Sequence, residues 1–370
     1  MSQRTNSSPL ASYQPLRTLF QLAFIGSIVA RLPLWLTTSL ISHLRPHPKW
    51  TFKQALMLRI TYTIVDMNSR IGVTEPLSVK KGKDDRFQVV EAFDSSFYVG
   101  ELAHHYIKPV PVGCTWFPQA PKRDIASKTV VLYLHGGAFV LGDGRQGFCG
   151  FPARMIVEHG NVDFMFSVQY RLSGYSGANS FPSAVQDALT TYLFLLTTLH
   201  IPADRIVLAG DSAGGNLAIA LLRYIKEYGR ELKLPPPKCC LLFSPWTAPY
   251  DLNIESNSNF STDWLPRSLL RWGTATYGSG QHIPETNRYI TPLRNPFQSG
   301  IPIFVNYGAL EIFRPNIIRW AQEMEQGGNN IELHCEDDAP HDTMLLGGLL
   351  GFESSARNVA VEVGSFVSKH

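Results

Sequence analysis

The sequence predicts an α/β protein with a mostly parallel central sheet covered by helices on both faces. From Lys128 onward, short apolar runs alternate with segments of helical length and spacing, and this order of elements builds a parallel sheet. The apolar runs are nearly continuous, as expected for strands that are buried on both faces. Hydrophobic residues make up 44% of the chain and charged residues only 17%, which excludes disorder as the dominant state.

The expected elements follow one another along the chain. Strands are expected at 129–134, 162–168, 205–209, 239–243, 303–307 and 331–335. Helices are expected at 53–67, 181–199, 216–228, 317–326 and 356–367. Pro182 falls in the first turn of one of these helices, where its missing N–H costs little.

Two stretches interrupt the alternation of strands and helices. Residues 51–85 precede the predicted sheet, and residues 246–300 form a long insertion rich in Trp, Pro, Asn and Ser. Long insertions between strands usually form lids or caps. We therefore expect a main domain at 51–370 whose cap comes from these two stretches, and a separate N-terminal segment at 1–50.

The N-terminal segment is basic and apolar. Residues 1–50 hold five basic residues and no acidic residue, whereas the whole chain has a net charge of +3. The apolar stretches 19–30 and 32–41 are separated by Arg31, and only together are they long enough to span a bilayer. The alternatives are an interfacial helix and a helix packed on the body, and no signal-peptide cleavage site follows the first stretch. We expect membrane association through residues 17–45, at the endoplasmic reticulum in one interpretation, and a cytoplasmic protein without it.

Composition excludes several classes of protein. The small net charge does not indicate a nucleic-acid partner. The five cysteines are scattered and contain no C-x-x-C pair, so neither a disulfide framework nor a cysteine metal site is expected. Two glycosylation sequons, at Asn6 and Asn259, matter only if the body enters the secretory lumen. The sequence makes no prediction of oligomeric state.

Two motif matches do not predict a cofactor or a metal. A G-x-G-x-x-G pattern occurs at 142–147, but a dinucleotide site needs it directly after a strand, and seven residues intervene here. Acidic residues at 337–338 lie between His334 and His341, but the spacing fits no standard zinc pattern. We therefore expect no cofactor and no metal.

A G-x-S-x-G motif places a serine between a predicted strand and a predicted helix. The motif consists of Gly210, Ser212 and Gly214. In this setting a tight turn holds the serine in a strained conformation, with its hydroxyl exposed above the sheet at a helix N-terminus. The residues two positions away must lack side chains to avoid a collision, which accounts for both glycines. Ser212 is therefore the candidate nucleophile.

A second glycine motif follows the strand at 129–134. The stretch His135-Gly-Gly-Ala138 resembles the HGGG loop whose backbone N–H groups bind the oxyanion formed in acyl transfer. The expected donors are the N–H groups of Gly136, Gly137 and Ala213. Ala138 stands where the third glycine is usual, and it keeps its own N–H.

These motifs together resemble the hormone-sensitive-lipase branch of the α/β-hydrolases, which includes arylacetamide deacetylase and fungal steryl acetyl hydrolases. The resemblance covers roughly residues 128–345 and includes the stretches 135–138, 170–172, 181–182 with Asp187, 210–215, 291–293 and 340–342. It departs at residues 173–178, which replace an acidic Ala-Pro-Glu turn, and at Gln169, where the family often has Asp. It implies the α/β-hydrolase fold with a helical cap, and the departures affect the shape of the pocket rather than the chemistry.

The resemblance also assigns the partners of the serine. Pro340-His341-Asp342 matches the family's histidine loop, and Glu311 stands where the family usually has the acid that holds the imidazole tautomer. A solvated loop histidine and a surface carboxylate are the plain alternatives, and Asp342 is a second candidate for the acid. Asp211 matches the family motif but is expected to bond the backbone or a nearby Tyr or Arg.

The expected activity is carboxylic-ester hydrolysis on a small apolar ester with an acetyl or short acyl group. Ser212 would attack the carbonyl, His341 would shuttle the proton and Glu311 would orient the histidine. The aromatic insertion indicates an apolar site. The alternatives are a hydrolase or cyclase that tailors a polyketide or terpenoid with the same serine, and a non-catalytic binder similar to the gibberellin receptor, which lacks the histidine.

Overall fold

The computed structural model describes residues 7–80, 84–122 and 124–370. The strands of the described residues form one eight-stranded sheet in the order β1-β2-β4-β3-β5-β6-β7-β8. The strands are β1 (Phe87–Val90), β2 (Val112–Phe117), β3 (Val130–Leu134), β4 (Phe164–Gln169), β5 (Ile206–Asp211), β6 (Cys239–Phe243), β7 (Ile303–Gly308) and β8 (Ile331–Glu336). β2 pairs antiparallel with both β1 and β4, and every other neighbouring pair is parallel.

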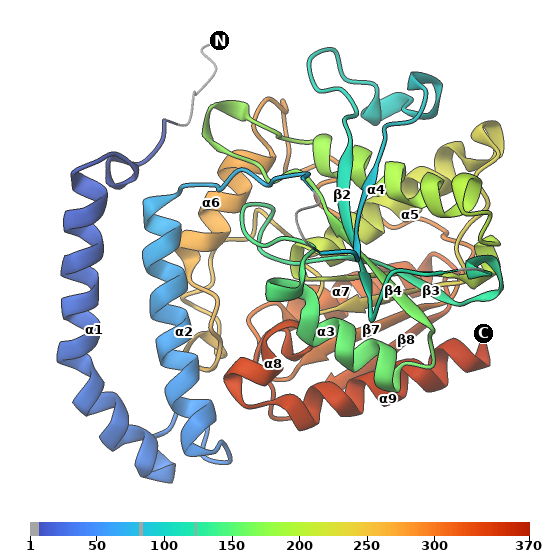
Figure 1. The fold of residues 1–370 in the computed structure, drawn as a ribbon. Helices are drawn as coiled ribbons and strands as arrows, with labels where there is room; N and C mark the ends of the chain where they lie inside the picture. Colours follow the sequence, from blue (N-terminus) through green and yellow to red (C-terminus); the bar gives the residue numbers. More distant parts are fainter. Residues whose placement is uncertain (1–6, 81–83, 123) are drawn as a thin grey trace.

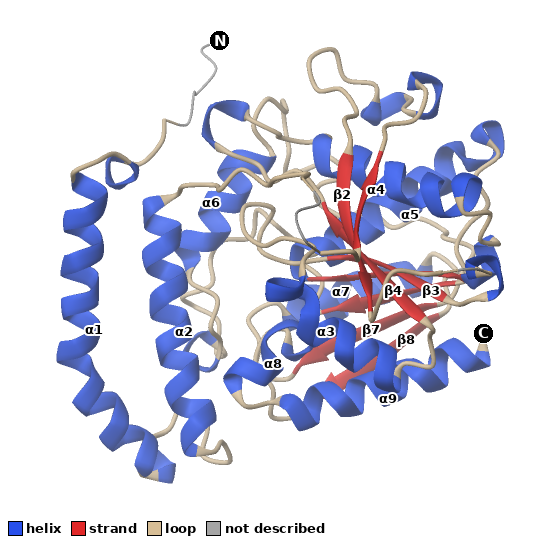
Figure 2. Cartoon of the chain, viewed as in Figure 1, coloured by secondary structure: helices blue, strands red, loops and turns tan. Residues whose placement is uncertain are grey.

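Helices cover both faces of this sheet (Figures 1 and 2). They are α1 (Leu16–Leu40), α2 (Phe52–Ile71), α3 (Gln146–His159), α4 (Ser183–Leu193), α5 (Ser212–Leu232), α6 (Arg267–Tyr277), α7 (Arg314–Gln326), α8 (Thr343–Leu350) and α9 (Glu353–Lys369). Along β3, Val131 and Tyr133 belong to the core under α3 and α9, whereas Leu132 and Leu134 belong to the core under α4, α5 and α7. Both faces are apolar because both are covered. The predicted α/β architecture is confirmed.

Several elements differ from the sequence prediction. β1, β2, α3 and α8 were not expected, because β1 is short and because glycines and Pro152 hide the helical pattern of α3. The helix predicted at 181–199 is α-helical only from Ser183 to Leu193 and continues as a π-helix, Phe194–Thr198. The G-x-G-x-x-G pattern leads into α3, and its Gly144 lies against the backbone of β4, where a Cβ atom would come within 2.9 Å of it.

The N-terminal apolar stretches form a single helix. α1 continues through Arg31 and Pro33, and the Arg31 guanidinium donates to the carbonyl and hydroxyl oxygens of Ser27. α1 lies beside α2 at the edge of the molecule (Figure 1). Only Ser39 of this helix is buried, and its long apolar side chains point outward. α1 thus packs on α2 along one side and leaves much of its apolar surface exposed.

The two stretches that were expected to form a cap meet each other. α2 lies beside α6, which comes from the long insertion (Figure 1). The Ser268 hydroxyl of α6 donates to Asp66 of α2 at 2.6 Å. α2 begins with a capping box in which Thr51 and Gln54 bond each other's backbone N–H groups.

Candidate active site

The candidate nucleophile sits at the junction of β5 and α5. Ser212 has a φ of +49°, a strained conformation for a residue with a side chain. A Cβ atom on Gly210 would come within 2.3 Å of the Gly214 carbonyl oxygen, and one on Gly214 would come within 1.9 Å of the Leu134 oxygen. Both glycines of the motif are therefore required by the turn, for the steric reason given above.

His341 and Glu311 lie in line with this serine. Nε2 of His341 is 3.0 Å from Oγ of Ser212, and Nδ1 of His341 is 3.3 Å from Oε2 of Glu311. His341 lies in the loop between β8 and α8, and Glu311 lies in the turn between β7 and α7. The His341 and Glu311 side chains are fully buried. The structure thus brings together three predicted residues from three distant segments.

Ser244 was missed by the sequence analysis. It directly follows β6, and its hydroxyl donates to Oε2 of Glu311 at 2.6 Å and accepts from the N–H of Asp342 at 3.1 Å. Its place at the carboxyl end of a central parallel strand, where the ligands of such sheets bind, is the signal that would have found it.

Asp342, the second candidate for the acid, has a structural role instead. Its Oδ1 atom accepts from the N–H of Leu345 at 3.0 Å, so it caps the start of α8. It also lies near the carboxyl group of Asp211, which is fully buried. Burial, with the negative charge of Asp211 acting in the same direction, raises the pKa of Asp342 well above its ordinary value. One proton between the two carboxyl groups avoids a buried pair of like charges.

Asp211 holds the glycine loop, as its expected structural role suggested. Its Oδ1 atom accepts from the Tyr133 hydroxyl at 2.6 Å, and its Oδ2 atom accepts from the N–H of Gly136 at 2.8 Å. Gly136 is therefore not available as an oxyanion donor, and this part of the prediction is wrong. The sequence could not show that the carboxylate beside the nucleophile reaches back to this N–H.

Other N–H groups at the loop are open. No described residue accepts a hydrogen bond from the N–H of Gly137 or Ala138. These residues have φ values of +107° and +53°, so the loop turns sharply here. Ala213 is the second residue of α5, where N–H groups have no partner within the helix and the helix dipole favours negative charge. The open donors are thus Gly137, Ala138 and Ala213.

Burial shifts the pKa values of the two partners in opposite directions. It raises the pKa of Glu311 to about 8 and lowers that of His341 to about 4. The negative charges of Asp263 and Asp211 act in the other direction on the pKa of His341, but burial has the larger effect. His341 is therefore neutral near pH 7, the state in which an imidazole can accept the proton of a serine.

Aromatic rings enclose the serine. The backbone N–H of Trp246 donates to the carbonyl oxygen of Ser212, and its ring lies between Phe139 and Phe313 at centroid distances of 5.8 and 5.9 Å. Phe139 stacks at 3.7 Å on Tyr277 of α6, and Phe313 meets the ring of His341 at 5.0 Å. Ser212 is itself buried, and these rings bring apolar surface to its neighbourhood.

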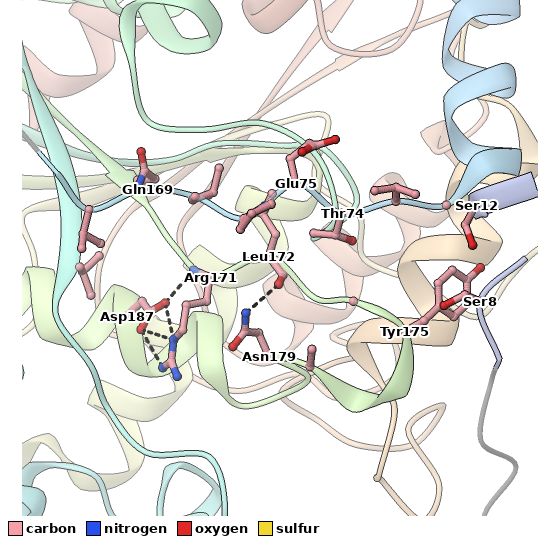
Figure 3. A pocket seen from close by; sticks show the side chains of 18 of the residues that line it. Ser8, Ser12, Thr74, Glu75, Gln169, Arg171, Leu172, Tyr175, Asn179 and Asp187 are labelled. Carbon is pink, nitrogen blue, oxygen red and sulfur yellow. Dashed lines mark hydrogen bonds and ion pairs between the residues drawn. The ribbon is translucent and has the colours of Figure 1, made fainter. Parts of the chain in front are cut away.

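A cavity of about 520 Å³ lies elsewhere, between the N-terminal region and the loop after β4 (Figure 3). Its lining includes Thr74, Tyr175 and the residues that depart from the family pattern after Leu172. Arg171 and Asp187 form a close ion pair at 2.8 Å here (Figure 3). Arg171 also donates to three neighbouring oxygens, so its charge is already matched. Ser212 does not line this cavity.

No group of three His, Cys, Asp or Glu residues within the described part of the chain could hold a metal ion. His334 and His341, which flank Asp337 and Asp338 in the sequence, do not form such a group with them. His334 instead lies 3.2 Å from the side-chain amide of Asn306.

Residues 131–345 match the family described as alpha/beta hydrolase fold, and the chain belongs to this family. A relative named esterase LipI, from Mycobacterium tuberculosis, is 26% identical over 68% of this chain and 76% of its own length. An acetyl-hydrolase of Streptomyces hygroscopicus is 35% identical, but the match covers only 35% of this chain and 38% of that protein. The neutral cholesterol ester hydrolase 1 of rat is 29% identical over 42% of this chain and 38% of its own length.

Solved structures agree at the level of the fold. A crystal structure of an esterase from the bacterial hormone-sensitive lipase family matches with a TM-score of 0.60 over 85% of this chain and 97% of that chain, at 21% identity. A thermostable esterase from Pseudomonas putida matches with a TM-score of 0.59 over 83% of this chain and 88% of that chain, at 18% identity. The predicted resemblance, and with it the class of carboxylic-ester hydrolases, is confirmed by the family and its esterase relatives.

Proposed function

We propose that this protein hydrolyses an apolar carboxylic ester through Ser212, His341 and Glu311. The observation that carries the proposal is the buried line of contacts from the serine hydroxyl to the glutamate, at 3.0 and 3.3 Å. Each residue has the geometry that its role requires: a nucleophile on a strained turn, a neutral base within reach of it, and a carboxylate behind the base.

The reaction follows from this arrangement. Oγ of Ser212 attacks the ester carbonyl while its proton passes to Nε2 of His341, and Glu311 stabilises the resulting imidazolium. The negative charge that develops on the carbonyl oxygen is met by the N–H groups of Gly137, Ala138 and Ala213. The proton then passes to the leaving alcohol, and water repeats the sequence to release the acid.

The enclosing rings support an apolar substrate. Phe139, Trp246 and Phe313 bring aromatic surface to the site. One relative is named acetyl-hydrolase and another neutral cholesterol ester hydrolase. We therefore propose an ester with an acetyl or short acyl group and an apolar alcohol.

The proposal is tested with the purified protein and p-nitrophenyl esters of short acids. We expect Ser212→Ala to lower kcat/KM by about 10⁴-fold or more, because the nucleophile is lost, and to leave the melting temperature nearly unchanged. Ser365→Ala, which changes an exposed serine of α9, is the matched control.

Unchanged turnover in Ser212→Ala would contradict the mechanism. A phosphonate probe should form an adduct on Ser212 that mass spectrometry can map, and its absence would favour a non-catalytic binder. A screen of acetylated sterols and cyclic esters would then define the substrate.

A further inference from the structure

A short segment of the long insertion encloses the turn that carries Glu311. The four carbonyl oxygens of Ala309–Ile312 all accept hydrogen bonds from its side chains. Thr262 donates to the carbonyl of Leu310 and Asn257 to that of Ile312. Asn259 donates to the carbonyls of both Ala309 and Glu311, and each of the four bonds is 3.0 Å long. On the other side of the turn, the N–H of Leu310 donates to the carbonyl of Ala339. All four carbonyls of the turn thus accept from the insertion, and Arg314 also donates to those of Ala309 and Glu311.

The next two residues of the segment, Asp263 and Trp264, form hydrogen bonds to the turn that carries Glu311 and to the backbone of His341. Oδ2 of Asp263 accepts from the N–H of Ile312, the residue after Glu311, at 2.7 Å. Nε1 of Trp264 donates to the carbonyl oxygen of His341 at 2.7 Å, and Oδ1 of Asp263 accepts from the N–H of Trp264. Asp263 and Trp264 are both buried. One dipeptide thus joins the acid turn to the histidine loop.

We propose that residues 257–264, here called the clasp, are a positioning element that fixes Glu311 against His341. Asp263 is its central positioning residue. The inference rests on the proposed function, because it gives the clasp a role only if Glu311 acts through His341. The insertion would then be part of the catalytic framework as well as a cover.

The geometry supports this role because the clasp and the strand ends hold different groups of the acid turn. The N–H of Glu311 donates to Gly308 at the end of β7, whereas its carbonyl oxygen accepts from Asn259 of the clasp. Misplacement of a catalytic group by about 1 Å can lower a rate by about 100-fold. The carbonyl bonds of the clasp and the Asp263 bond fix the position of Glu311 from both ends of the turn.

Asp263 also adds a buried negative charge. Its charge favours the protonated form of His341, and burial raises its own pKa to about 6. The other ionisable groups at this place are Glu311 from the β7 turn, and Asp211 and Asp342 beside the nucleophile and the histidine. Loss of the Asp263 charge should therefore lower the pKa of His341.

A double-mutant cycle tests the proposal. We expect Asp263→Asn to lower kcat by about 10- to 100-fold with little change in KM, because the acid turn moves while the substrate wall remains. In a Glu311→Gln background, the same substitution should lower kcat by less than about threefold. Asp251→Asn, which changes an exposed carboxylate of the same insertion, is the matched control and should leave kcat unchanged.

Thr262 provides a milder pair of variants if Asp263→Asn fails to fold. Thr262→Val removes the donor to Leu310 and should lower kcat, whereas Thr262→Ser keeps the hydroxyl and should restore it. An equal loss for Asp263→Asn in both backgrounds, or equal kcat for the Val and Ser variants, would overturn the clasp. If Glu311→Gln alone had no effect, the proposed role of Glu311 would fail instead.

Discussion

The environments of Glu311 and His341 set the protonation of the candidate site. Burial raises the pKa of Glu311 to about 8 and lowers that of His341 to about 4. If the proton of the pair sits on Glu311, the carboxyl donates to Nδ1, and Nε2 then carries a hydrogen and cannot accept the serine proton. The active form needs the carboxylate and an Nδ1–H imidazole.

We therefore expect kcat/KM to rise with pH between about 7 and 9, centred near the pKa of Glu311, because loss of the proton converts the pair to its active form. The measurement is kcat/KM for p-nitrophenyl acetate from pH 5 to 9, corrected for spontaneous hydrolysis. Glu311→Gln should flatten this rise. A wild-type profile that is flat, or that falls as the pH increases, would contradict the assignment of these protonation states.

At the scale of elements, the clasp explains a motif that the sequence left open. Asn259 belongs to a glycosylation sequon, and its side-chain nitrogen, the atom that would carry a glycan, donates to two carbonyls of the acid turn. A glycan at this atom would have to displace that turn. The other sequon, at Asn6, lies outside the described residues.

When the chain is directed through the secretory pathway of a eukaryotic host, we expect Asn259 to remain unmodified in the folded, active protein. Peptide mass spectrometry of the purified active fraction measures this. The control is an exposed sequon added at the C-terminus, whose glycan reports entry into the lumen. A glycan on Asn259 in protein of full activity would count against the clasp geometry.

At the scale of the whole molecule, α1 is distinctive. It has 25 residues, and its most apolar window of 18 residues has a mean hydropathy of 1.6 with none of it buried. Within the described chain it alone is long and apolar enough to cross a membrane. Segment 1–50 is basic without any acid. Arg59 of α2 donates to Ser39 and Leu44, which fixes the end of α1 to the body. We propose that residues 17–45 attach the protein to a membrane.

Deletion of residues 1–45 should move the protein from the membrane pellet to the supernatant after ultracentrifugation, because it removes the exposed apolar surface of α1. Leu22→Glu with Val29→Glu should have the same effect without shortening the chain, since both side chains are more than half exposed. Val361→Glu, which places the same charge on an exposed position of α9, is the control. An unchanged pelleted fraction in both test variants would refute membrane attachment through α1.

Local patterns in the sequence were enough to predict the alternating strands and helices and the turn at Ser212, and the resemblance to a family selected His341. The local features depend on nearest neighbours: apolar runs, glycines that leave room in a turn, and the order of elements. Short or irregular elements, such as β1 and α3, were missed because their patterns are brief or interrupted by glycine and proline.

Contacts between distant segments were decided only by the tertiary structure. It placed Glu311, and not Asp342, against His341, and it assigned the N–H of Gly136 to Asp211. It also brought residues 257–264 around the acid turn. Each of these outcomes depends on which buried donors and acceptors meet across the fold, because a buried polar group needs a partner, and no local pattern specifies which one it finds.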